Sequence, residues 1–144
     1  MSSEFGKNFK VSVFGESHGK AIGVVISGLP AGIELDMDEL QQFMDRRRPG
    51  SSDLTTRRKE ADTPVFLAGI NGTTTNGFPI CAIIENTDTR SKDYSELWDK
   101  PRPSHADFTA RARFGDSVDM RGSGHFSGRL TAPLCIAGGI AKQF

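Results

Sequence analysis

FGESHGKAIGVVISGLPAGIELD, Phe14 to Asp36, is the stretch of this sequence that indicates the fold most directly. A short strand, Lys10–Phe14, leads into it, and glycines on both sides of Glu16-Ser17-His18 let the backbone turn tightly. A second strand over residues 23–29 supports the turn from behind. The stretch therefore predicts a hairpin that lifts His18 out of the sheet. A rigidly held imidazole suits acid–base chemistry near neutral pH, while a merely exposed turn histidine is the alternative.

The rest of the chain reads as a mixture of helices and strands. A helix is predicted to begin after Asp36, an N-cap with Glu39 three residues on, and to end near Arg48 because Pro49 disfavours helical geometry before it. The other expected elements are hairpin strands at Val65–Ile70 and Phe78–Ile84 turning at Asn71-Gly72, a helical turn at Asp93–Trp98, a short helix capped by Asp107 that carries Phe108, Ala112 and Phe114, and a helix from near Ser127 to the end of the chain. This pattern predicts a mixed α/β layered domain.

Composition sets the broad class. At 144 residues and 36% hydrophobic content the chain is expected to form one domain, residues 1–144, with its own core. It shows neither an apolar span of membrane length nor a basic-then-apolar leader, so no membrane partner and no secretion are predicted. Cys81 and Cys135 lack CxxC spacing and are expected to be small buried hydrophobes in a reducing compartment. The predicted location is cytoplasmic.

Charge distribution points to a small anionic ligand. A formal net charge of zero argues against a nucleic-acid partner, which normally requires a basic excess. Two segments are nevertheless locally basic: residues 45–60 hold six Arg or Lys against three acids, and residues 100–113 hold four against one, an excess of +3 in each. Such basic zones in a neutral protein favour a compact anion over a polymer.

Five blocks of the sequence resemble signature segments of the chorismate synthase family. They are the opening stretch (14–36), DRRRPG (45–50), IENTDTRSKDY (84–94), RPSHAD (102–107) and RGSGHFSGRLTAP (121–133). They occur in the order and at the spacing of the family. Family members are more than twice as long, so the chain resembles their N-terminal portion and is expected to be a fragment or a truncated product. The resemblance implies a β-α-β sandwich with helices packed between sheets.

The resemblance also implies a function. Chorismate synthase is a carbon–oxygen lyase that converts 5-enolpyruvylshikimate 3-phosphate to chorismate by 1,4-anti elimination of phosphate and a ring proton. It needs reduced FMN although no net oxidation occurs, with NADPH as one candidate reductant, and it is typically a homotetramer. The chemistry requires cations for the phosphate and two carboxylates, acids near the phosphate and the flavin, and a pocket that excludes water.

The cations implied by the resemblance are arginines. Arg47 is the best match to the ligand-binding arginine of its block, Arg48 and Arg57 are secondary candidates, and Arg129 matches an arginine that faces the substrate. Asp53 stands where many members carry a further arginine. An arginine at a helix end can instead serve only to complement the helix dipole, and that alternative stays open for this cluster.

Two histidines match the acids of the family. His18 corresponds to the histidine near the leaving phosphate and His105 to the one near the flavin ring. Ser104 replaces the usual glycine before His105, which introduces strain if that position needs a positive φ. Asp107 is expected either to orient an imidazole or to cap the following helix.

A glycine-rich block precedes the last helix and is typical of an anion site, although a simple turn is the alternative. In the family, residues aligned with His125, Phe126 and Ser127 contact FMN. Glu85, Asn86, Asp88 and Arg90 match another block, where solvation or loop scaffolding is the expected role. Three histidines without HxH or HExxH spacing predict no metal site.

Two other functions remain as alternatives to the lyase. One is an inactive fragment that retains only binding or subunit contacts. The other is a phosphate-binding module without catalysis, which would bind its ligand with no dependence on flavin.

Overall fold

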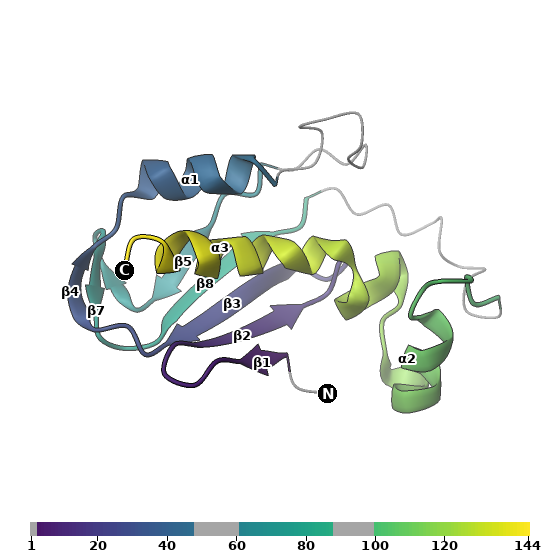
Figure 1. The fold of residues 1–144 in the computed structure, drawn as a ribbon. Helices are drawn as coiled ribbons and strands as arrows, with labels where there is room; N and C mark the ends of the chain where they lie inside the picture. Colours follow the sequence, from purple (N-terminus) through teal and green to yellow (C-terminus); the bar gives the residue numbers. More distant parts are fainter. Residues whose placement is uncertain (1–2, 48–60, 88–99) are drawn as a thin grey trace.

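The computed structural model describes residues 3–47, 61–87 and 100–144 (Figure 1). Its strands are β1 (Glu4–Phe5), β2 (Lys10–Gly15), β3 (Ala21–Ser27), β4 (Ala31–Glu34), β5 (Val65–Ala68), β6 (Ile70–Asn71), β7 (Thr74–Asn76) and β8 (Ile80–Glu85). Its helices are α1 (Met37–Asp45), α2 (Asp107–Phe114), α3 (Thr131–Ala141) and the short 3₁₀ segments η2 (Gly115–Ser117), η3 (Arg121–Phe126) and η4 (Gly128–Leu130).

Two antiparallel sheets organise these elements. The larger has the strand order β1-β2-β3-β8-β5, and the smaller has the order β4-β7-β6. In the larger sheet, β2 and β3 form the predicted hairpin, with Gly15 opposite Ile22 at its closed end. β3 then pairs along its other edge with β8, about sixty residues further along the chain. The hairpin is thus held from one side by β8.

The core lies between the larger sheet and two helices on one of its faces. Figure 1 shows α3 crossing the sheet and α1 running beside α3. Alternate residues of β3, namely Ile22, Val24 and Ile26, are completely buried there, as the period of two in a strand requires. At Gly139 an added Cβ would lie 2.5 Å from a methyl carbon of Leu40, so a glycine in α3 permits close packing against α1.

Helix α1 begins as predicted and ends earlier than predicted. The Asp36 carboxylate accepts a hydrogen bond of 2.8 Å from the Glu39 N–H, which confirms the N-cap. The helix ends at Asp45, however, and not near Arg48. The N–H of Arg47 donates to the Met44 carbonyl in a turn after the helix. The tight last turn therefore places Arg47 beyond the helix.

The second predicted hairpin is only partly correct. The predicted strands Val65–Ile70 and Phe78–Ile84 correspond to β5 and β8, which do pair with each other but have different bounds. Asn71-Gly72 does not connect them directly, because it lies at the turn between the short strands β6 and β7 of the smaller sheet. The strand β4, which pairs with β7, had no signal in the sequence strong enough to predict it. An Asn-Gly turn fixes the nearest pair of strands and leaves the longer-range pairing undetermined.

The C-terminal helices also differ from expectation. Ala106 occupies the N-cap of α2, and Asp107 is its first residue, so Asp107 does not cap the helix. The buried residues of α2 are Asp107 and Ala110, whereas Phe108 is 69% exposed. The predicted helix from Ser127 begins as η4, whose first turn the Ser127 hydroxyl caps, and α3 ends at Ala141. The helical turn predicted at residues 93–98 lies outside the described residues.

The predicted fold class is confirmed as a mixed α/β layered arrangement. Cys81 in β8 and Cys135 in α3 are both half-buried, rather than fully buried as expected, and neither forms a disulfide. Within residues 3–47, 61–87 and 100–144, none of the helices has the length and apolar character needed to cross a bilayer.

Candidate active site

The β2–β3 hairpin sets His18 against the glycine-rich block. Gly15 has φ +93°, and a Cβ there would lie 2.4 Å from the Ala21 carbonyl oxygen, so only glycine fits at the start of the turn. The His18 ring packs onto Gly122, where an added Cβ would be 2.1 Å from Nδ1. Ser17 is buried, and its N–H donates to the Gly124 carbonyl across 3.1 Å. The predicted lifted histidine is thus present, and it is half-buried by a segment about a hundred residues away.

The glycine-rich block has an unusual backbone. Gly122, Ser123 and Gly124 have consecutive φ values of +58°, +69° and +54°, a run that non-glycine residues rarely adopt. His125 then joins this block to the start of the hairpin, because its Nδ1 lies 2.7 Å from the Gly15 carbonyl oxygen. A carbonyl can only accept, so Nδ1 carries the proton. Nε2 lies 2.6 Å from the hydroxyl of Ser3 and completes the attachment.

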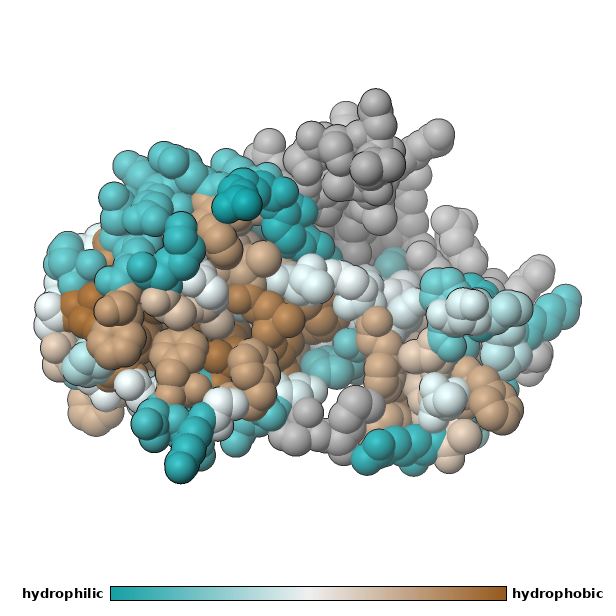
Figure 2. Space-filling model, viewed as in Figure 1, coloured by the Kyte–Doolittle hydropathy of each residue, from teal (hydrophilic) through white to brown (hydrophobic). Residues whose placement is uncertain are grey.

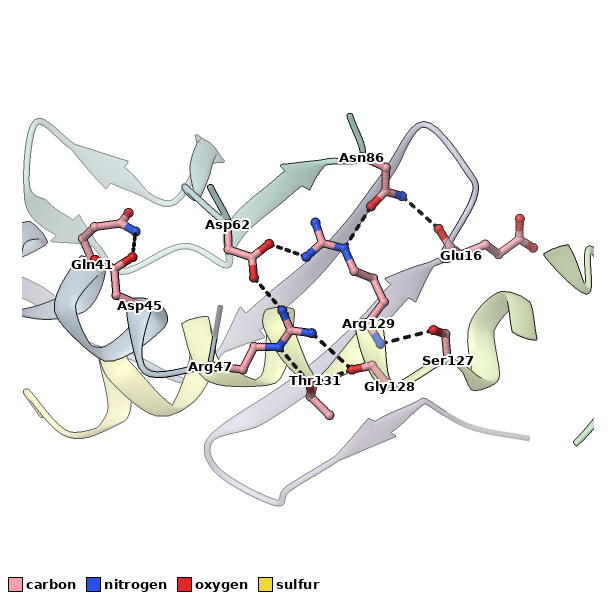
Figure 3. A network of polar contacts seen from close by, with 10 residues as sticks. All are labelled: Glu16, Gln41, Asp45, Arg47, Asp62, Asn86, Ser127, Gly128, Arg129 and Thr131. Carbon is pink, nitrogen blue, oxygen red and sulfur yellow. Dashed lines mark hydrogen bonds and ion pairs between the residues drawn. The ribbon is translucent and has the colours of Figure 1, made fainter. Parts of the chain in front are cut away.

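Two predicted arginines meet at a carboxylate that the sequence did not single out. Asp62 is fully buried and binds Arg47 through one oxygen, at 2.5 Å, and Arg129 through the other (Figure 3). Arg129 is also buried, with a side chain 3% exposed. Buried carboxylates and guanidinium groups are stable only when paired in this way. The side chain of Arg47 therefore reaches a buried partner, which corrects the alternative that it serves only the helix dipole.

Asn86 connects this arginine cluster to the histidine turn. Its Nδ2 donates to the Glu16 carbonyl at 3.0 Å, and its Oδ1 accepts a hydrogen bond of 3.2 Å from Nε of Arg129 (Figure 3). The same Nδ2 also donates to the Gly19 carbonyl at 2.9 Å. The expected scaffolding role is confirmed for Asn86. The cations and the imidazole are thus held in a fixed relation by one amide side chain.

Arg47 is anchored at the start of α3 as well. Its Nε donates to the Thr131 hydroxyl at 3.1 Å, and its Nη2 reaches the Gly128 carbonyl at 3.5 Å. The side chain of Arg47 as a whole is 19% exposed. Arg48 and Arg57 lie outside the described residues, as does Asp53, the residue at a position where many family members carry arginine.

The RPSHAD block is organised by an ion pair. Arg102 donates to both oxygens of Asp107, at 2.8 and 2.9 Å, and also to the Ser123 hydroxyl at 2.9 Å, which joins this block to the glycine-rich one. Asp107 therefore binds an arginine, in place of either predicted role. Ser104 has φ +64°, so the expected strain at the position usually taken by glycine is present. The side chain of His105 is exposed.

The Arg102–Asp107 pair predicts a loss of stability in acid. Hydrogen bonds from Arg102, opposed by burial, lower the pKa of Asp107 from 3.8 to about 2. Because the pKa of Asp107 is lower in the folded state than in the unfolded chain, its ionised carboxylate stabilises the fold at pH values above the unfolded-state pKa. This stabilisation is lost as the pH falls from about 4 to about 2. We expect it to be about 2 kcal/mol.

Denaturant unfolding at several pH values tests this expectation. Asp107→Asn should flatten the dependence of the unfolding free energy on pH between about 4 and 2, while the exposed Asp116→Asn should leave it unchanged. Equal slopes for Asp107→Asn and the wild type would show that the pair contributes nothing.

A pocket of about 290 Å³ opens beside the histidine turn. It is lined by Ser3, Glu16, Phe114, Ser117, Val118, His125 and Phe126. Two of the three predicted flavin contacts, His125 and Phe126, thus line the same pocket. The apolar side chains of its lining are Phe114, Val118 and Phe126. Among the described residues, its lining includes neither Ser127, which caps η4, nor His105.

Comparison with known proteins gives a consistent result. A protein-family model described as chorismate synthase matches residues 9–144. Chorismate synthase of Lancefieldella parvula is 53% identical over 144 residues, which is 99% of this chain and 38% of that protein. Chorismate synthase of Methanocaldococcus jannaschii is 48% identical over 143 residues, with the same two coverages.

A solved structure agrees with the sequence matches. The one titled "Crystal Structure of Chorismate Synthase" has a TM-score of 0.67 and 25% identity, over 95% of this chain and 33% of that one. The chain spans 38% of the length of the two relatives named above. With a family model matched over nearly all of its residues, the chain belongs to the chorismate synthase family.

Proposed function

We propose that this chain forms part of a chorismate synthase, which eliminates phosphate from 5-enolpyruvylshikimate 3-phosphate to give chorismate. In this reaction the C–O bond to phosphate breaks, a ring proton is lost, and a new double bond forms without net oxidation. The observation that carries the proposal is the bridge made by Asn86 between the His18 turn and Arg129. It unites an acid and a pair of cations, the two kinds of group that departure of a phosphate needs.

His18 is the proposed acid for the leaving phosphate. The pKa of Asp119 is lowered, first by hydrogen bonds from Arg121 and further by the charge of nearby His18. The Asp119 carboxylate and the His18 imidazole are thus close neighbours at the proposed site. His105 is proposed to act at the flavin, in keeping with the family assignment.

Arg47 and Arg129 are the proposed anion ligands, with Arg48 and Arg57 as further ones. Guanidinium groups bind phosphate and carboxylate through paired N–H donors. The Arg47–Asp62–Arg129 cluster carries two positive charges and one negative charge, so it retains a net attraction for anions.

His125, Phe126 and Ser127 are proposed to contact FMN, which in its reduced form supplies an electron-rich ring beside the substrate. The apolar walls of the pocket formed by Phe114, Val118 and Phe126 suit one part of a flat ring system. Its volume of about 290 Å³ is at the lower limit of ligand pockets, so the described residues fit part of a flavin. NADPH as reductant, a homotetrameric assembly and a cytoplasmic location are proposed with the same function.

An anaerobic assay of the full-length gene product tests this function. With 5-enolpyruvylshikimate 3-phosphate and chemically reduced FMN, we expect chorismate to appear by absorbance, in step with released phosphate. Omission of FMN should abolish the signal. Binding of phosphate compounds without flavin-dependent turnover would instead support a phosphate-binding module.

Replacement of Arg47 tests the anion site. We expect Arg47→Ala to weaken substrate binding by about 1.5–3 kcal/mol, the range for hydrogen bonds to charged groups. The melting temperature should also fall, because buried Asp62 loses one of its two partners. Calorimetric titration with substrate and thermal melts measure the two effects separately.

Arg46→Ala is the matched control for Arg47. Arg46 is exposed, and its guanidinium lies over the ring of Phe43, 5.7 Å from the centre of the ring. Its removal should leave substrate affinity within a factor of two. If Arg47→Ala lowers the melting temperature while affinity holds, Arg47 has a structural role only.

A further inference from the structure

We propose that Asp62 is a positioning residue, which holds Arg47 and Arg129 side by side in the orientation that binds the anionic groups of the substrate. The proposal rests on the proposed function and adds a residue to its site. Asp62 itself does not touch the substrate in this arrangement. It acts through the two guanidinium groups.

The contacts show one carboxylate shared between two arginines. Each oxygen of Asp62 binds a terminal nitrogen of a different arginine, and the side chain of Asp62 is completely buried. The arginines come from opposite parts of the chain, one after α1 and the other from η4 (Figure 3). A shared carboxylate fixes both the distance between two planar cations and the direction of their other N–H groups.

Charge gives a reason for the shared carboxylate. Two guanidinium groups in a buried region repel each other when nothing negative lies between them. With Asp62 the cluster has a net charge of one positive unit. Arg47 donates three hydrogen bonds to described residues, Asp62, Thr131 and Gly128, and these use three of its five N–H groups. The arrangement can therefore accept an anion at Arg47 while Asp62 stays bound.

The backbone at Asp62 adds an independent observation. Its φ is +50°, in the left-handed region that non-glycine residues seldom occupy. Such conformations cost free energy and are concentrated at functional sites, where surrounding contacts maintain them. Here the contacts are the two arginines. Asparagine tolerates the same region as well as aspartate does, so Asp62→Asn removes the charge while it keeps the backbone and the shape.

The test compares Asp62→Asn with the wild type in the full-length gene product. We expect the KM for 5-enolpyruvylshikimate 3-phosphate to rise at least tenfold, with a smaller change in kcat and an FMN affinity within a factor of two. Glu39→Gln is the matched control, because it removes the carboxylate of an exposed ion pair with Lys142. A folded Asp62→Asn enzyme with unchanged KM would overturn the proposal.

A double variant keeps the test decisive if Asp62→Asn does not fold. Arg47→Gln with Asp62→Asn removes one charge of each sign, so the cluster keeps its net charge and no two arginines face each other without a carboxylate between them. Because Asp62 also holds Arg129, the double variant should bind substrate more weakly than Arg47→Gln alone. A double variant that binds substrate as well as Arg47→Gln, or better, would contradict the proposal.

Inorganic phosphate separates this proposal from the proposed function. A wild-type protein that forms no chorismate would refute the lyase but not the role of Asp62. In that case, calorimetric titration with phosphate should still show at least tenfold weaker binding to Asp62→Asn. Equal phosphate affinity of the two proteins, or no phosphate binding to the wild type, would refute the role of Asp62.

Discussion

Replacement of His18 with alanine is expected to lower turnover by roughly 10²–10⁴-fold, the usual contribution of a general acid. The ring is half-buried against Gly122 and lies near the Asp119 carboxylate, so its position is controlled by its surroundings. Alanine removes the proton donor and leaves the hydrogen bonds of the turn, which are made by backbone atoms and Asn86. FMN affinity should therefore stay near that of the wild type.

Single-turnover measurements of chorismate formation in the full-length gene product test this expectation. Lys20→Ala is a suitable control, since Lys20 is an exposed residue of the same turn. A His18→Ala enzyme whose turnover is within a factor of two of the wild type would exclude His18 as the acid. A large fall that is accompanied by loss of FMN binding would indicate damage to the fold instead.

Local features of the fold could be predicted from the sequence because their causes are local. Glycines at 15 and 19 specify the turn around His18, and Asp36 with Glu39 specifies the start of α1. The strand partners were harder to predict, because β3 pairs with β8 across a long connection. Periodicity in a single strand says which residues face the core and not which strand lies beside it.

The arginine cluster shows the same limit at the candidate site. Arg47 and Arg129 were identified from their motifs, but Asp62 is 67 residues from Arg129 and is followed by an ordinary edge strand. Asn86 is 43 residues from Arg129 and resembled a loop residue. Their roles depend on contacts between distant segments, and no spacing within one segment encodes such contacts. A single acidic residue before a strand is therefore a weak indication of a functional site, even where it lies at the centre of one as Asp62 does.

The polypeptide of residues 1–144, prepared alone, is expected to show no measurable chorismate synthase activity and at most weak FMN binding. Its relatives are more than twice as long, and the pocket of about 290 Å³ is at the lower limit of the range that buries a ligand well. A flavin held only there would leave much of its ring in water. Contacts that position it against the substrate would be missing, and catalysis depends strongly on such positioning.

The surface of the chain leads to a second expectation for this polypeptide. Figure 2 shows hydrophobic residues gathered over α3, below the hydrophilic outer side of α1, and Leu134 of α3 is 40% exposed. On β5, Val65 and Leu67 are 46% and 60% exposed. Exposed apolar surface of this kind favours association, so the 144-residue polypeptide should also self-associate as its concentration rises.

Anaerobic incubation with 5-enolpyruvylshikimate 3-phosphate and reduced FMN tests the activity of this polypeptide, and light scattering tests its association. The full-length gene product, assayed beside it, shows that substrate and flavin are competent. Because His18, Arg47 and Arg129 are all present in the polypeptide, an absence of turnover cannot be assigned to loss of these groups. It would mean that an acid and its cations are insufficient without an enclosed flavin. Steady turnover by residues 1–144 would refute the prediction and place the whole catalytic apparatus within this chain.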